Sequence, residues 1–149
     1  MLEHVRIAPG ITAFTPLDFY DYPITHSLIG TLGWAALFAG VWMAVRGRER
    51  AAILLAAAVL SHWVLDVIAH RPDMPVLPSG PYLGLGLWNS IPATLVVELT
   101  MFAAGVALYL HAIGAGRRRL SFWLFVAFLL VAYFGASFGP PPPDKRTLA

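Results

Sequence analysis

The sequence predicts an all-α polytopic membrane protein with four transmembrane helices. Of its 149 residues, 58% are hydrophobic and only 12% are charged, about half the charged share of an ordinary soluble domain. The apolar residues are concentrated in four blocks, and each block has the roughly 20 residues that a helix needs to cross a bilayer. Short clusters of arginine separate the first block from the second and the third from the fourth.

The same composition excludes several classes of protein. Sparse charge argues against a water-soluble enzyme. The net charge of +2 does not indicate a nucleic-acid partner, because the arginines form only short clusters between apolar blocks. The absence of cysteine excludes thiol chemistry, iron–sulfur clusters and cysteine zinc sites. The N-terminal segment has no basic region followed by an apolar core, so we expect no cleavable signal peptide.

Residues 1–139 are predicted to form a single transmembrane domain. The segment up to Pro23, which includes LDFYDYP, is expected to lie at the outer membrane interface, and Pro23 suits the first turn of a helix. Asn89 or Ser90 is expected to cap the third membrane-spanning helix. The proline-rich residues 140–149 are predicted to form an extended, solvated tail. The expected spans are about residues 26–45, 51–70, 91–113 and 120–138.

Arginines in the connections between the spans predict the orientation of the chain. The longer second connection contains only Arg71, whereas the first and third contain Arg46, Arg48, Arg50, Arg117, Arg118 and Arg119. By the positive-inside rule these two connections are cytoplasmic, and both termini face outside, which is the periplasm in a bacterium. Lys145 and Arg146 oppose this orientation, but they are two residues against six. We therefore expect a multi-pass protein of the bacterial inner (plasma) membrane, surrounded by the lipid bilayer.

A few ionisable residues fall inside the predicted spans. His62, Asp66 and His70 follow one another at intervals of four residues in the second span, so they share one face of a helix. His26 opens the first span, and Glu98 lies in the third. Ionisable side chains are costly inside a membrane, which makes each of them a candidate functional residue.

The depths of these residues can be compared by counting along the spans. Counting from the first arginine connection places His26 between Asp66 and His70 in height, while His62 lies about 12 Å deeper than His70. Glu98 lies at about the depth of His62. We expect a shallow layer of His26, Asp66 and His70 and a deeper pair of His62 with Glu98, all in the outward half of the membrane. Three aspartates of the flanking segments are within reach of the shallow layer: Asp18, Asp21 and Asp73.

Imidazole and carboxylate groups are ligands for Zn²⁺, Mn²⁺ or Fe²⁺, and a catalytic zinc ion uses three such ligands while keeping one position open for water. We therefore predict a divalent metal site, with zinc the expected ion. The candidate ligands are His26, His62, Asp66 and His70. Glu98 or Asp73 is the candidate proton acceptor for hydrolysis of an ester or phosphoester in a lipid-proximal substrate.

Other interpretations of these residues stay open. Buried His–Asp or His–Glu pairs also fasten helices together without catalysis. The small size and the lack of a sizeable extramembrane domain fit a non-catalytic accessory or structural subunit of a larger membrane protein complex. Ligation of haem by two histidines, such as His26 and His70, is a third possibility. Ion transport is disfavoured, because the cytoplasmic halves of the spans carry almost no ionisable residues.

Two short motifs, THSL at residues 25–28 and SHWVLD at residues 61–66, resemble those of the bacterial membrane-bound metal-dependent hydrolase family. The resemblance covers roughly residues 18–98 and implies that His26, His62 and Asp66 are metal ligands. The depths estimated along the spans favour His70 as the third ligand beside His26 and Asp66, whereas the motif favours His62. In that family a histidine precedes the THS motif, but this chain has LDFYDYPITHS instead. Asp18 or Asp21 is the expected substitute for that histidine.

Overall fold

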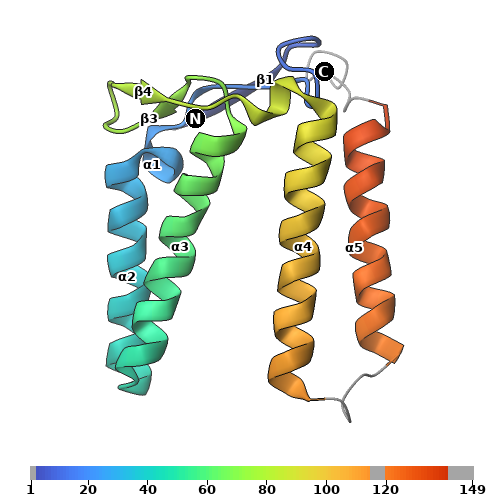
Figure 1. Cartoon of the computed structure of the whole chain (residues 1–149). Helices are drawn as coiled ribbons and strands as arrows, with labels where there is room; N and C mark the ends of the chain where they lie inside the picture. Colours follow the sequence, from blue (N-terminus) through green and yellow to red (C-terminus); the bar gives the residue numbers. More distant parts are fainter. Residues whose placement is uncertain (1–2, 115–119, 141–149) are drawn as a thin grey trace, which may run out of the picture.

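Two long helical hairpins extend from one cap in the computed structural model, which describes residues 3–114 and 120–140 (Figure 1). All four predicted spans are confirmed as helices that are long and apolar enough to cross a membrane. These helices are α2 (Leu28–Arg46), α3 (Glu49–Ala69), α4 (Ile91–Ile113) and α5 (Leu120–Phe138). The three arginines of the third connection, Arg117–Arg119, and all but the first residue of the predicted 140–149 tail lie outside the described residues.

The helix boundaries follow from residues that start or stop a helix. Ser27 has an extended backbone and accepts a hydrogen bond from the Gly30 N–H, so the first span begins at residue 28 rather than at 26. Gly47 ends α2 in the left-handed conformation, with φ of 62°, and its N–H bonds the Met43 carbonyl. Ser90 accepts a hydrogen bond from the N–H of Ala93, which confirms the predicted cap of α4.

The cap consists of short elements between and before the long helices. A two-stranded antiparallel sheet joins β1 (His4–Ile7) to β2 (Leu17–Asp21), and a second joins β3 (Met74–Pro75) to β4 (Tyr82–Leu83). These strands were not predicted, because they are too short to produce a clear alternation of apolar and polar residues. The cap also contains the four-residue helix α1 (Pro23–His26) and the 3-10 turn η1 (Leu87–Asn89).

A buried aspartate holds the cap together. The Asp18 side chain is only 1% exposed, and its carboxylate accepts hydrogen bonds from Arg6, at 2.6 Å, and from Arg71. Arg71 also donates to Asp73 at 2.8 Å, and His70 Nδ1 lies 3.1 Å from the other Asp73 oxygen. Burial raises the pKa of the Asp73 carboxyl, but these hydrogen bonds outweigh burial and hold its pKa below the usual range. The network therefore ties the N-terminal sheet to the end of α3.

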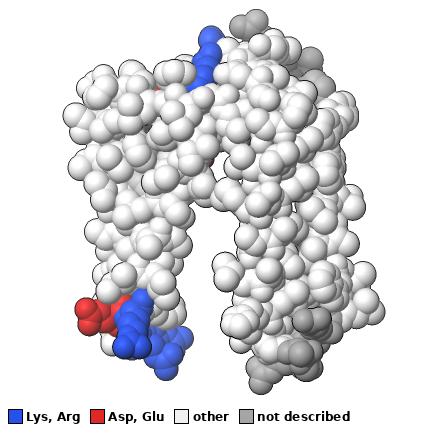
Figure 2. Space-filling view, in the orientation of Figure 1, with Lys and Arg blue, Asp and Glu red and all other residues white. Residues whose placement is uncertain are grey.

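The two hairpins diverge below the cap. Helices α2 and α3 pack against each other, and η1 contacts both α3 and α4. Figure 2 shows an arch-shaped opening between the α2–α3 and α4–α5 hairpins, with most of their surface uncharged. Charged residues instead gather at the end of the α2–α3 hairpin far from the cap, where α2 ends at Arg46 and α3 begins at Glu49. The long helices are thus largely exposed in the described chain rather than packed on one another.

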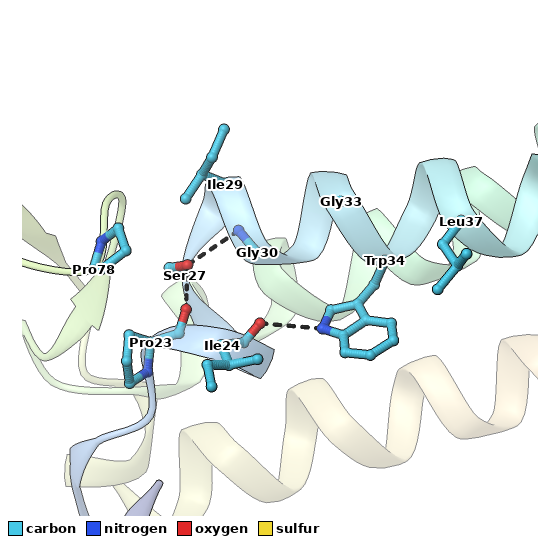
Figure 3. Close-up of a pocket in the computed structure, with 9 residues that line it drawn as sticks. All are labelled: Pro23, Ile24, Ser27, Ile29, Gly30, Gly33, Trp34, Leu37 and Pro78. Atoms are coloured by element: carbon cyan, nitrogen blue, oxygen red, sulfur yellow. Dashed lines mark hydrogen bonds between the residues drawn. The ribbon is translucent and has the colours of Figure 1, made fainter. Parts of the chain in front are cut away.

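A tight joint connects α1 to α2. Ser27 Oγ bonds both the Pro23 carbonyl and the Gly30 N–H, and the Trp34 indole N–H donates to the Ile24 carbonyl at 3.1 Å (Figure 3). A Cβ atom at Gly30 would overlap the Ile24 carbonyl oxygen. Gly30 thus makes room for α1, while Gly33 and Gly40 face open space.

This joint predicts different outcomes for two neighbouring glycines. Gly30→Ala is expected to destabilise the protein by about 1–3 kcal/mol, because the added methyl group meets backbone that cannot move freely. Gly33→Ala is expected to be neutral or stabilising by up to about 1 kcal/mol, since alanine favours a helix and meets nothing there. Unfolding in detergent monitored by circular dichroism measures both changes. Equal effects at the two positions would contradict this account of the joint.

Candidate metal centre

Three of the predicted ligands meet where the cap joins the α2–α3 hairpin. One ligand atom from each of His26, His62 and Asp66 lies within 4.8 Å of the other two. Nε2 of His62 is 3.1 Å from Asp66 Oδ2, and Nε2 of His26 is 3.9 Å from the same oxygen. The two imidazole rings have their centroids 5.1 Å apart. A single ion could therefore be held by all three side chains.

The local fold explains this convergence. His62 and Asp66 are one turn apart on α3, so they project from the same face. His26 is the last residue of α1, and the break at Ser27 turns this short helix back against the end of α3. His62 is 55% exposed and, with Thr25 and Thr31, lines an opening of about 450 Å³ beside α2 and α3. This opening makes the cluster accessible from outside the protein.

One oxygen in the cluster has an unmet requirement. Asp66 Oδ2 is buried, and it accepts no hydrogen bond from any described residue. An oxygen acceptor that is buried without a donor costs free energy. Two imidazole nitrogens lie beside this oxygen. A divalent cation could be coordinated by the two nitrogens and the oxygen together. The residues present therefore fit a metal ion.

A chain of hydrogen bonds sets the tautomer of His26. Thr25 Oγ1 donates its one proton to Glu3 Oε2 at 2.8 Å, so it can only accept from His26 Nδ1, which it also contacts. In the neutral ring Nδ1 then carries the proton, and Nε2 presents its lone pair toward Asp66. Metal-binding histidines are commonly oriented by such a bond at the other ring nitrogen. Glu3 and Thr25 were not predicted to take part, and Glu3 lies too far along the chain from His26 for spacing to reveal it.

Two pKa shifts agree with this arrangement. Burial lowers the pKa of His26, and the nearby Asp66 charge offsets only part of that effect, so the neutral, metal-binding form is favoured. Burial raises the pKa of Glu3, but hydrogen bonds from the backbone and side chain of Thr25 and from the Ile24 backbone outweigh it, so its pKa lies below the usual range. Glu3 therefore acts as a charged acceptor near neutral pH.

The expected shallow layer is wrong in one member. His70 does not join His26 and Asp66, because its Nδ1 lies 3.1 Å from Asp73 and its ring packs 4.5 Å, between centroids, from Trp88. His70 is the C-terminal cap of α3 and has an extended backbone. Its side chain is held by Asp73, and the geometry groups His62, not His70, with the other ligands.

The expected deep pair of His62 and Glu98 is also wrong. Glu98 accepts hydrogen bonds from the Trp88 indole at 3.3 Å and from the Tyr133 hydroxyl at 2.7 Å, which tie α4 to η1 and α5. Glu98 nevertheless lies near the cluster, because it shares a pocket of about 250 Å³ with Asp66. Counting along the spans compares depths, but depth does not fix the direction in which a side chain points.

The flanking aspartates have other partners. Asp18 is bound to two arginines in the cap, and the two oxygens of Asp73 are paired with His70 and Arg71. Asp21 pairs with His4 in the register of the β1–β2 sheet. None of these three aspartates belongs to the group of ligand atoms around Asp66 in the described part of the chain.

Comparison with known proteins identifies a family for most of the chain. The model of the YdjM inner membrane protein family matches residues 23–139, a range that begins at α1 and contains all four membrane-spanning helices. No curated protein and no solved structure matches the chain. The inner-membrane location predicted from the apolar blocks and arginine connections is confirmed by this family and by the four candidate spans.

The resemblance to the membrane-bound metal-dependent hydrolase family is wrong, because the family that matches is the YdjM inner membrane protein family. The motifs that suggested it are short, and a histidine and an aspartate four residues apart can occur on any helix. The histidine that precedes the THS motif in that family is also absent from this chain. The grouping of His26, His62 and Asp66 therefore depends on their geometry alone.

Proposed function

The chain belongs to the YdjM inner membrane protein family, and we propose that it binds a divalent metal ion through His26, His62 and Asp66 and hydrolyses an ester or phosphoester of a lipid-proximal substrate. The observation that carries this proposal is the meeting of three ligand atoms, two imidazole nitrogens and the buried Oδ2 of Asp66, which accepts no hydrogen bond from the described residues. The six arginines of the first and third connections support a periplasmic position for this site.

Zinc is the ion that the ligand set favours, with Mn²⁺ and Fe²⁺ as alternatives, since two imidazoles and one carboxylate leave a fourth position open. A divalent ion bound there supplies a coordinated water with a pKa of about 7 and polarises the scissile carbonyl or phosphoryl group. His26 is oriented for this task by the bond that its Nδ1 makes to Thr25.

Glu98 is the residue that we propose as proton acceptor. Its carboxylate lines the pocket next to Asp66, where it takes a proton from the attacking water and returns it to the leaving oxygen. The Tyr133 hydroxyl and the Trp88 indole hold this carboxylate in place. Asp73 is not proposed for this role, because it pairs with His70 and Arg71 in the cap and does not line this pocket.

Metal analysis of the purified protein tests the proposal. We expect about one zinc ion per chain, lost in His26→Ala and retained in the control His111→Ala, whose side chain lies in the last turn of α4 at the other end of the membrane. Hydrolysis of a chromogenic ester or phosphodiester should stop on chelation and return with added zinc. A wild-type protein without stoichiometric metal would contradict the proposal and favour the non-catalytic accessory subunit.

The Glu3–Thr25–His26 chain gives a further prediction. Glu3→Gln is expected to weaken zinc binding by about tenfold, because the charged acceptor that fixes the Thr25 hydroxyl, and through it the His26 ring, is lost. Thr25→Ser keeps the hydroxyl and should bind zinc as the wild type does. Titration against a chromophoric chelator measures both affinities. A tenfold loss in Thr25→Ser with none in Glu3→Gln would show that this hydrogen-bond chain does not orient His26.

A further inference from the structure

The pocket shared by Asp66 and Glu98 lies where the two hairpins begin to separate. Its volume is about 250 Å³, and its walls come from α3, α4 and η1. Leu65 and Ile68 line it from α3, and Val97 and Met101 line it from α4. The pocket therefore combines a polar end, next to the group of His26, His62 and Asp66, with aliphatic walls.

The position of the pocket connects it to the bilayer. Val97 and Met101 lie six and ten residues beyond the start of α4, which corresponds to about 9–15 Å into the span. The arch between the hairpins is open in the space-filling view (Figure 2). Since α3 and α4 are long and apolar enough to span a membrane, this opening lies at the level of the bilayer's acyl chains.

The size of the pocket favours an acyl chain over another helix. A helix with its side chains is about 10–12 Å across, so 250 Å³ would admit only about 3 Å of its length. An acyl chain is a single row of methylene groups and fits a narrow space. Because the bilayer is as apolar as the pocket walls, the chain itself gains little by entering. Selectivity must therefore come from the polar end, at Asp66 and Glu98.

We propose that this pocket receives an acyl chain of a membrane lipid and brings the ester or phosphoester group of that lipid to the candidate metal site of His26, His62 and Asp66. This inference rests on the proposed function, and it names the substrate class as a bilayer lipid that enters sideways through the arch. The chain lies between Leu65 and Met101, and the group to be cleaved lies between Asp66 and Glu98.

A photoactivatable lipid tests the proposal in the reconstituted protein. The probe is a phosphatidylethanolamine with a diazirine in one acyl chain, and the labelled residues are located by mass spectrometry. We expect label concentrated on residues 65–69 and 97–101. Val97→Trp fills the pocket and should lower this labelling about tenfold, whereas Val96→Trp, at a neighbouring residue that is 67% exposed and does not line the pocket, should leave it unchanged. Circular dichroism of both variants checks that they fold alike.

The outcomes separate this inference from the proposed function. Label spread evenly over the exposed faces of α4 and α5, or label insensitive to Val97→Trp, would overturn it even if the protein binds zinc. Disulfide-linked dimers of a Val97→Cys variant, in a chain that has no other cysteine, together with absent lipid adducts would also overturn it, since a second copy would then fill the arch. Pocket-selective labelling of a wild type that lacks metal would support the lipid site and contradict hydrolysis. His26→Ala should keep the labelling, because the chain site is separate from that ligand.

Discussion

Replacing Asp66 with asparagine is expected to weaken zinc binding at least about 100-fold while leaving the fold intact. The substitution keeps the shape of the side chain but removes the negative charge and an oxygen ligand from the centre of the cluster. Loss of a residue that only orients a ligand typically costs 10–100-fold in affinity, so loss of a ligand should cost at least as much. Competition with a chromophoric chelator measures the change.

Glu98→Gln is the matched control for this variant. It makes the same change of charge on the other wall of the same pocket, but Glu98 is bound to Trp88 and Tyr133 and does not belong to the ligand group. We expect this variant to keep its zinc and to lose hydrolytic activity. Equal loss of zinc in both variants would indicate a general effect of negative charge near the pocket, and unchanged affinity in Asp66→Asn would remove Asp66 as a ligand.

Replacing Arg71 with methionine is expected to lower the free energy of unfolding of the cap by about 3 kcal/mol. The change leaves the buried Asp18 carboxylate with one arginine instead of two and removes a donor from Asp73. Removing one partner from a buried ion pair typically costs 3–5 kcal/mol, and the remaining bond from Arg6 places this case at the lower end. Hydrogen exchange of the β1–β2 amides, together with chemical unfolding in detergent, measures the loss.

Arg46→Met serves as the comparison, since Arg46 is exposed at the end of α2 far from the cap and its loss should cost little. Acid should act on the same network as Arg71→Met. The pKa of Asp73 is lowered in the folded protein, so its contribution to stability is present above the ordinary aspartate pKa of about 3.9 and is lost as the pH falls below it. If Arg71→Met and Arg46→Met unfold alike, the ion pairs of the cap do not stabilise it.

The spans were predictable from the sequence because a membrane helix needs only length and apolar composition, and both are properties of a continuous segment. The closeness of His62 and Asp66 was equally predictable, since a helix fixes neighbours four residues apart. The place of His26 depended on more than counting. Ser27 interrupts the helix, so His26 belongs to α1 and reaches α3 from the cap rather than from the first span.

What the sequence could not predict are the directions of side chains and the contacts between distant segments. His70 has the right spacing, but it caps α3 with an extended backbone and turns to Asp73. Glu98 lies in the predicted third span, but its hydrogen-bond donors come from η1 and α5. Glu3 reaches Thr25 only because α1 folds back beneath the N-terminal segment. Each of these depends on tertiary packing that no local pattern encodes.

The arch has a mechanical consequence. The two hairpins are joined chiefly through η1 and the cap, so their far ends are free to move apart about this connection. A change in their spread would alter the width of the Asp66–Glu98 pocket while the packing of α2 on α3 is kept. A bilayer whose lateral pressure or thickness changed this spread would therefore change the distance between these two carboxylates.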